Sequence, residues 1–141
     1  MTTLFDTNIL IDAAVSTRRY HGAAVRLVAA AERGEVDGLF APTSVATCVA
    51  TCWYVAHERE QTDPRPLFDL LADVMRVAPM GRPALRTALQ AAETDDFEDA
   101  YLAAAGAAAG ASVVATRNEA DFENTSLTPY HPLDFVQMIE Q

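Results

Sequence analysis

The sequence predicts an α/β fold, a three-layer sandwich around a central, mostly parallel sheet of four or five strands. Short apolar runs with β-like patterning alternate with longer runs of helical periodicity along the 141 residues. The connections between the expected strands are long enough for crossover helices and too long for hairpins. Half of the residues are apolar, which is enough to bury a core on both faces of such a sheet.

The N-terminal part of the chain contains two expected strands, at 2–5 and 37–41, because both runs are short, apolar and followed by helical patterns. The expected helices run from about Asn8, over 21–34 and over 42–58. Gly34 suits the end of the second helix, since glycine adopts the left-handed conformation found there. Pro42 or Thr43 suits the start of the third.

The C-terminal part repeats the alternation. Its expected elements are a helix at 63–74, a strand at 75–80, helices at 82–93 and 95–110, a strand at 111–116 and a helix at 131–141. Prolines bracket the first of these helices, and Gly110 closes the Ala-rich one. Because no linker, repeat or low-complexity tail interrupts the pattern, we expect residues 1–141 to form a single domain.

Composition narrows the class of protein. The net charge of −10, with arginine as every one of the ten basic residues, argues against a broad basic surface for nucleic acid. No apolar run approaches the roughly 20 residues needed to cross a bilayer, so we expect a soluble protein without membrane contact. Cys48 and Cys52 lie four apart in a helical run and are expected to pack as small apolar side chains, which favours a cytoplasmic location.

Polar side chains gather where ligands bind in open parallel sheets, beyond the carboxyl ends of the strands. The first strand is followed by Asp6, Thr7 and Asn8, and the run 111–116 is followed by Arg117, Asn118 and Asp121, with Thr116 at its end. The helix between them opens with Asp95, Asp96, Glu98 and Asp99.

Each acid also has an ordinary structural explanation. Asp95 with Glu98 matches a capping box, and Asp6 or Asn8 can cap the first helix. Asp12, a turn further along, is expected to be solvated. Asp121 lies in a loop where aspartate is a common turn former.

Taken together, carboxylates from three separate segments are predicted to converge at one edge of the sheet. Their mutual repulsion would be costly without a cation, and hard oxygen ligands are what Mg²⁺ or Mn²⁺ prefers. The sequence therefore favours a divalent metal site at this edge.

Three motifs carry a resemblance to a known family. They are "FDTNILID" near the start, "DDFEDAYLAAA" late in the chain and "VVATRNEADF" after it. In their order and spacing they resemble the PIN domain family, in particular the bacterial toxin-like nucleases of the VapC type with a "DFEDA" helix start.

The resemblance implies a metal-dependent ribonuclease, often the toxin of a toxin–antitoxin pair and commonly a homodimer. It matches Asp6 and Asp99 to metal-binding carboxylates, and Asp96 and Asp121 to accompanying acids. It also matches Thr7, Asn8, Thr116 and Asn118 to polar residues of the same pocket. Arg117 is expected either to contact the RNA backbone or to be a surface charge beside an acidic loop. A cognate antitoxin would insert an arginine among the carboxylates.

The chain departs from the family pattern at one position. Relatives usually supply a glutamate from the helix after the second strand, but Thr47, Cys48 and Thr51 occupy the plausible positions here, and Glu58 lies about two turns too far along. In the same run, Cys52, Trp53 and Val55 are expected to belong to the core rather than to a dimer surface.

Two other classes of protein remain open. The missing glutamate suggests a PIN-like domain that binds RNA or protein without cutting. An acid after the first strand also suits a phosphatase with an aspartyl nucleophile, although "DTN" lacks the second aspartate two residues on that such an enzyme uses as acid and base.

Overall fold

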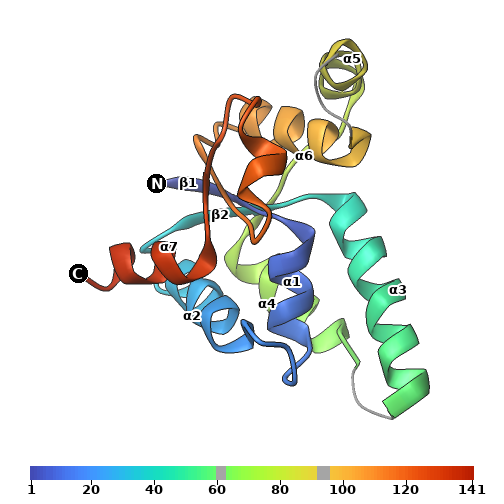
Figure 1. Cartoon of the computed structure of the whole chain (residues 1–141), viewed down its shortest axis with the longest axis vertical. Helices are drawn as coiled ribbons and strands as arrows, with labels where there is room; N and C mark the ends of the chain where they lie inside the picture. The colour runs from blue at the N-terminus through green and yellow to red at the C-terminus, as the bar shows by residue number, and fades with distance from the viewer. Residues whose placement is uncertain (60–62, 92–95) are drawn as a thin grey trace.

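The computed structural model describes residues 1–59, 63–91 and 96–141, and the chain forms the predicted α/β sandwich (Figure 1). One sheet has the strand order β3-β2-β1-β4-β5, and every neighbouring pair is parallel. The strands are β1 (Thr2–Phe5), β2 (Asp37–Phe40), β3 (Arg76–Val77), β4 (Val113–Ala115) and β5 (Thr128–Tyr130). Their carboxyl ends therefore share one edge of the sheet.

Helices cover both faces of this sheet. They are α1 (Thr7–Ala14), α2 (His21–Glu32), α3 (Pro42–Arg59), α4 (Arg65–Val74), α5 (Arg82–Gln90), α6 (Phe97–Ala108) and α7 (Pro132–Ile139), with a 3-10 helix η1 (Glu119–Phe122) after β4. In Figure 1, α6 and α5 lie on one side of the sheet, whereas α1, α2, α4 and α7 lie on the other. The sheet is thus the middle layer of three.

Alternation along the strands divides the core into two parts. On one face of the sheet, Leu4 and Val114 pack with Leu102 of α6. On the other face, Phe5 and Phe40 belong to a cluster with residues of α1 and α2. A Cβ on Gly106 would lie 3.1 Å from Leu4 Cδ2, so the glycine lets α6 approach β1 closely. This close approach fixes the helix that carries the late acids against the strand that carries Asp6.

Two details differ from the sequence-based expectations. The sequence pattern does not predict strand β5, because this strand is only three residues long and contains Pro129. Trp53 is 73% exposed on α3, so the expectation of a core position is wrong for this residue, although Cys52 is buried. The side chain of Val55 lies outside the described residues.

The cysteines are as expected, since Cys48 and Cys52 are both buried and their sulfur atoms lie 4.0 Å apart. Within the described ranges, none of the helices has both the length and the apolar content that a bilayer crossing requires.

Candidate functional site

The ends of β1 and β4 bring Asp6 and Thr116 side by side. The strands are neighbours in register, with Phe5 opposite Ala115, and the Asp6 amide donates to the Ala115 carbonyl at 3.0 Å. The next residue of each strand therefore starts the polar edge. Thr116 donates its hydroxyl to Asp6 Oδ2 at 2.8 Å, and both residues are buried.

Asp6 is also the N-cap of α1, as its position before the helix predicted. Its Oδ1 accepts from the Thr7 amide at 2.7 Å, while Oδ2 accepts from Asn8 Nδ2 at 3.0 Å as well as from Thr116. A carboxylate offers about four acceptor positions, so three are used and one is left for a further ligand. Capping and ligand binding are compatible at this residue.

Asn8 connects the start of α1 to the loop after β4. Its Oδ1 accepts from the Arg117 amide at 3.2 Å while its amide group donates to Asp6. Thr116 Oγ1 accepts from the Asn118 amide at 3.0 Å. The two loops are therefore held together by side chains that the sequence predicted to line one pocket. In the phosphatase alternative, Asn8 would have to be an aspartate that acts as acid and base.

The N-terminus of α6 supplies the second buried acid. Asp96 is the N-cap, and its Oδ1 accepts from the amides of Glu98 at 2.9 Å and Asp99 at 3.4 Å. The expected capping box of Asp95 with Glu98 is therefore replaced by a cap one residue later, and Asp95 itself lies outside the described residues. Asp99, in the first turn, is only 9% exposed.

The carboxylates raise one another's proton affinity. Burial first, and then the charges of Asp6, Asp96, Asp121 and Glu98, raise the pKa of Asp99 to about 7. Burial also raises the pKa of Asp6, the hydrogen bonds from Thr116 and Thr7 oppose that rise, and the charges of Glu98 and Asp121 add to it. Acids from α1, α6 and η1 thus lie within electrostatic reach of one another.

Asp99 remains accessible to a ligand. Among the described residues, no side-chain oxygen or nitrogen is both sealed from solvent and without a hydrogen-bond partner. No hydrogen bond reaches the Asp99 carboxylate within the same ranges, so its oxygens must keep contact with solvent. Asp121 and Asn118 are exposed on and before η1.

The donor set suits a hard divalent cation in its chemistry, because it consists of carboxylate, amide and hydroxyl oxygens. The side-chain positions do not form a complete cage. Within residues 1–59, 63–91 and 96–141, no group of three or more His, Cys, Asp or Glu side chains is close enough to hold a metal ion. The assignment of Asp6, Asp96, Asp99 and Asp121 as metal ligands therefore stays a prediction. The position of the buried Asp99 within electrostatic reach of Asp6, Asp96 and Asp121 is the observation that favours it.

A neighbouring residue escaped the sequence analysis. Ser44, in the first turn of α3, is fully buried, and its hydroxyl lies 2.7 Å from Thr7 Oγ1. The hydroxyl of Thr7 is thus directed to α3. Ser44 could have been found from its place just after the second strand, whose end adjoins that of β1. At the positions expected for a glutamate, Thr47 is exposed and Cys48 is buried.

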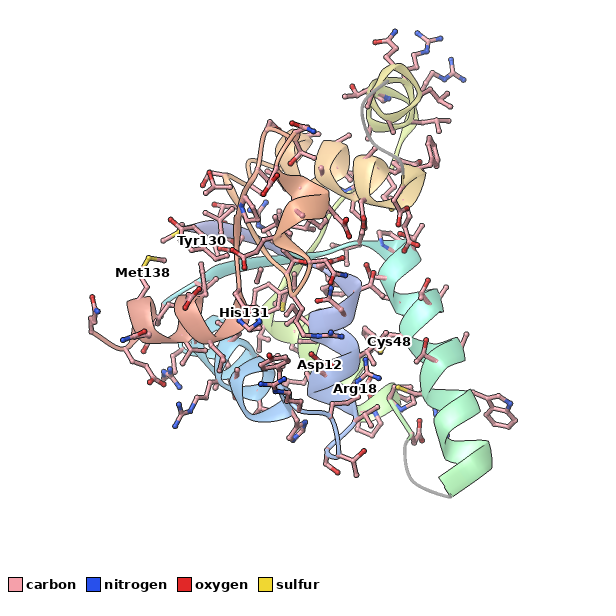
Figure 2. All side chains as sticks on the ribbon, in the orientation of Figure 1. Asp12, Arg18, Cys48, Tyr130, His131 and Met138 are labelled. Carbon is pink, nitrogen blue, oxygen red and sulfur yellow. The ribbon has the colours of Figure 1, made fainter. Side chains whose placement is uncertain are left out.

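A second buried carboxylate on α1 has a different environment. Asp12 is 1% exposed, which overturns the expectation that it is solvated. It accepts from Arg18 Nε at 3.0 Å and from Arg117 Nε at 2.6 Å (Figure 2 labels Asp12 and Arg18). Arg117 is therefore not a free surface charge, because its Nε ties the loop after β4 to α1, and its contact with the RNA backbone stays a prediction.

Comparison with known proteins gives one match. A family model described as PIN domain matches residues 2–120, which include Asp6, Asp99 and the end of β4. No curated protein matches the chain.

Proposed function

The chain belongs to the PIN domain family, whose members are generally nucleases, and on this premise we propose that it is a metal-dependent ribonuclease that hydrolyses RNA phosphodiester bonds. The observation that carries the proposal is the pair Asp6 and Asp99. Two largely buried carboxylates from distant segments lie within electrostatic reach of each other, and no arginine in the described ranges pairs with either.

Asp6 and Asp99 would hold a Mg²⁺ or Mn²⁺ ion, with Asp96 and Asp121 as direct or water-mediated ligands. When bound, such an ion supplies a water of lowered pKa and stabilises the charge of the scissile phosphate. Asp96 keeps one carboxylate oxygen outside its capping bonds, since both of those bonds use Oδ1. Asp121 is exposed at the same edge.

The neutral polar residues position the acids. Thr116 and Asn8 donate to Asp6 Oδ2 and so fix the orientation of this carboxylate toward the edge. Asn118, exposed beside Thr116, has a free amide side chain that can orient a water or a phosphate oxygen. Thr7 supports α1 through Ser44 rather than reaching the substrate itself.

We further propose that the protein is the toxin of a toxin–antitoxin pair that acts in the cytoplasm. The acidic edge lacks a cationic partner from the described chain, so an inserted arginine of an antitoxin would neutralise it and exclude metal. A homodimer through α3 is supported by Trp53, 73% exposed, and Val49, 40% exposed, one helical turn apart. Light scattering of a Trp53→Glu variant would test this face, and an unchanged dimer would contradict it.

The alternative is a PIN domain that binds RNA or protein without cutting it. It is favoured by the absence of a carboxylate at Thr47, Cys48 and Thr51, the plausible positions of the usual glutamate, and by the incomplete ligand cage within the described ranges. Retained RNA binding with no cleavage at any Mn²⁺ concentration would support it.

The direct test is cleavage of a structured RNA in Mn²⁺ by the wild-type protein and by Asp99→Asn. We expect the variant to lose at least about 100-fold in rate, because it removes a charge that would hold the ion. Asp73→Asn on the exposed face of α4 is the matched control and should cut as the wild type does. Equal cleavage by wild type and Asp99→Asn would refute the proposed site.

A further inference from the structure

Basic and aromatic side chains from the segment between α1 and α2 lie beside Arg117, which follows β4, and His131, the N-cap of α7. We call Arg18, Arg19, Tyr20, Arg117 and His131 the basic–aromatic patch. The Tyr20 and His131 rings are edge to face with centroids 4.9 Å apart, and the Arg19 guanidinium lies 5.1 Å from the centre of the Tyr20 ring.

The patch has a local excess of positive charge in a chain of net charge −10. Arg18 and Arg117 share the single carboxylate of Asp12, so this trio retains one positive charge. Arg19 is exposed and has no carboxylate partner within the described ranges, which adds a second. The arginines at positions 26, 33, 65 and 76 each pair with one acid of their own. Arg82 and Arg86 on α5 also form no ion pair within the described ranges, but it is Arg19 that lies over an aromatic ring. The patch is therefore suited to an anionic ligand.

Its aromatic rings offer a surface for stacking. Tyr20 and His131 are both half-buried, so each keeps part of its ring accessible, and the Arg19 guanidinium packs over the Tyr20 ring, where a stacking base would take its place. His131 Nδ1 accepts from the Leu133 amide at 3.2 Å, which leaves Nε2 as a donor. Guanidinium groups beside a ring that can stack are the combination that single-stranded nucleic acid requires.

The patch is continuous with the acidic edge. Arg117 carries both connections, because its amide donates to Asn8 Oδ1 and its Nε donates to Asp12. Asn8 in turn donates to Asp6. The proposal requires a strand whose scissile phosphate lies at Asp6 and Asp99 to pass along α1 and reach Arg19 and Tyr20.

We propose that the basic–aromatic patch is a binding site for single-stranded RNA, in which Arg19 and Arg18 contact phosphates and Tyr20 stacks on a base. This inference rests on the proposed ribonuclease function. The base is gripped through its ring face, so the patch contributes affinity and strand direction rather than sequence selection. An acidic segment of a partner protein would satisfy the arginines but would leave the stacking surface without use.

The test is binding of a short fluorescein-labelled single-stranded RNA, followed by anisotropy in EDTA at several salt concentrations, so that no cleavage takes place. We expect Arg19→Gln to weaken binding about 5-fold and to reduce the slope of log affinity against log salt by about 0.7, the value for one lost phosphate contact. Tyr20→Leu should weaken binding about 5-fold or more with little change of slope. Arg33→Gln removes the same charge from the exposed end of α2 and should bind as the wild type does.

Thermal unfolding of each variant checks that the fold is intact, and Arg19→Gln alone suffices if Tyr20→Leu unfolds early. Equal weakening by Arg19→Gln and Arg33→Gln, or none by either, would overturn the patch as an RNA site. The patch would also be refuted as an RNA site if a poly-glutamate peptide competed with RNA for the wild type but not for Arg19→Gln, while both proteins bound the RNA equally well. Cleavage is measured separately with Asp99→Asn. The binding experiment therefore tests the patch even if the nuclease proposal fails, and the cleavage experiment tests the nuclease proposal even if the patch fails.

Discussion

Two buried carboxylates, Asp6 before the start of α1 and Asp12 in its last turn, differ in the counter-charge around them. Asp12 is 1% exposed and accepts from two arginines, whereas Asp6 is 5% exposed and accepts only from neutral donors, those of Thr7, Asn8 and Thr116. The chain itself supplies counter-charge at Asp12. At Asp6, with Asp99 nearby, the described residues supply none.

This difference teaches that burial alone does not separate a functional acid from a structural one. A buried ionised carboxylate without a cation is costly, and the raised pKa of Asp99 expresses that cost. A site with buried carboxylates and no counter-charge of its own is suited to bind a cation from solution. Asp12 has no such need, and its role is to tie the segment after α1 and the loop after β4 to the helix.

The largest expected effect is from Asp6→Asn. We expect RNA cleavage to fall by a factor of about 100 or more, since a charged ligand is replaced by a neutral one of equal size. Metal-free stability should change little, because the removal of the buried charge is offset by an Nδ2 donor where one Asp6 oxygen accepts. Cleavage kinetics and urea unfolding of the same preparation measure the two effects. A variant that loses stability but keeps its cleavage rate would reverse the roles of the two acids.

Asp12→Asn should show the opposite result. Two arginines lose their shared carboxylate, and we expect a loss of about 2–3 kcal/mol in the free energy of unfolding. The value is below that for a sealed pair because the side chains of Arg18 and Arg117 are 38% and 26% exposed. Asp37→Asn, which breaks the exposed pair with Arg76, is the control and should cost at most about 1 kcal/mol. Equal losses for both variants would show that burial of Asp12 contributes nothing.

A smaller effect concerns pH. Between about pH 4 and pH 7, Asp99 is ionised in the unfolded chain but still protonated in the folded one, so the folded state binds more protons. The stability of the metal-free protein should therefore fall as pH rises through this window, by roughly 2 kcal/mol from this group, about half of what the full shift would give because the carboxylate keeps contact with solvent. Urea unfolding in EDTA across the window, compared with Asp99→Asn, isolates its contribution. Parallel curves for the two proteins would contradict the raised pKa.

The smallest effect is expected for Thr116→Val. The variant removes the hydroxyl that donates to Asp6 and accepts from the Asn118 amide, at a cost of about 1–2 kcal/mol in stability. The pKa of Asp6 should rise further, since a hydrogen bond that favours the ionised form is lost. The acid limb of the cleavage pH profile would then move to higher pH. Thr87→Val on α5, whose hydroxyl donates to the Pro83 carbonyl, is the control and should leave the profile unchanged.

Local patterns in the sequence were sufficient for the fold class and for the polar edge. Asp6 and Thr116 each follow an apolar strand directly, so the parallel sheet alone brings them together. The N-cap of α6 was placed one residue early, because Asp95 and Asp96 have the same capping chemistry and neighbouring positions in the chain.

The environment of Asp12 could not be predicted in this way. Its partner Arg117 is more than one hundred positions away in sequence, and the pairing depends on how the loop after β4 lies over α1. Helical periodicity gave no reason to bury a lone aspartate there. Long-range pairs of this kind, together with the three-residue strand β5, depend on tertiary packing rather than on local pattern.

Calorimetric titration with Mn²⁺ tests the contrast between the two acids most directly. We predict that the wild type binds the ion, that Asp99→Asn weakens binding by at least about 10-fold, and that folded Asp12→Asn binds as the wild type does. Binding that is unaffected by Asp99→Asn, or weakened as strongly by Asp12→Asn, would contradict the account.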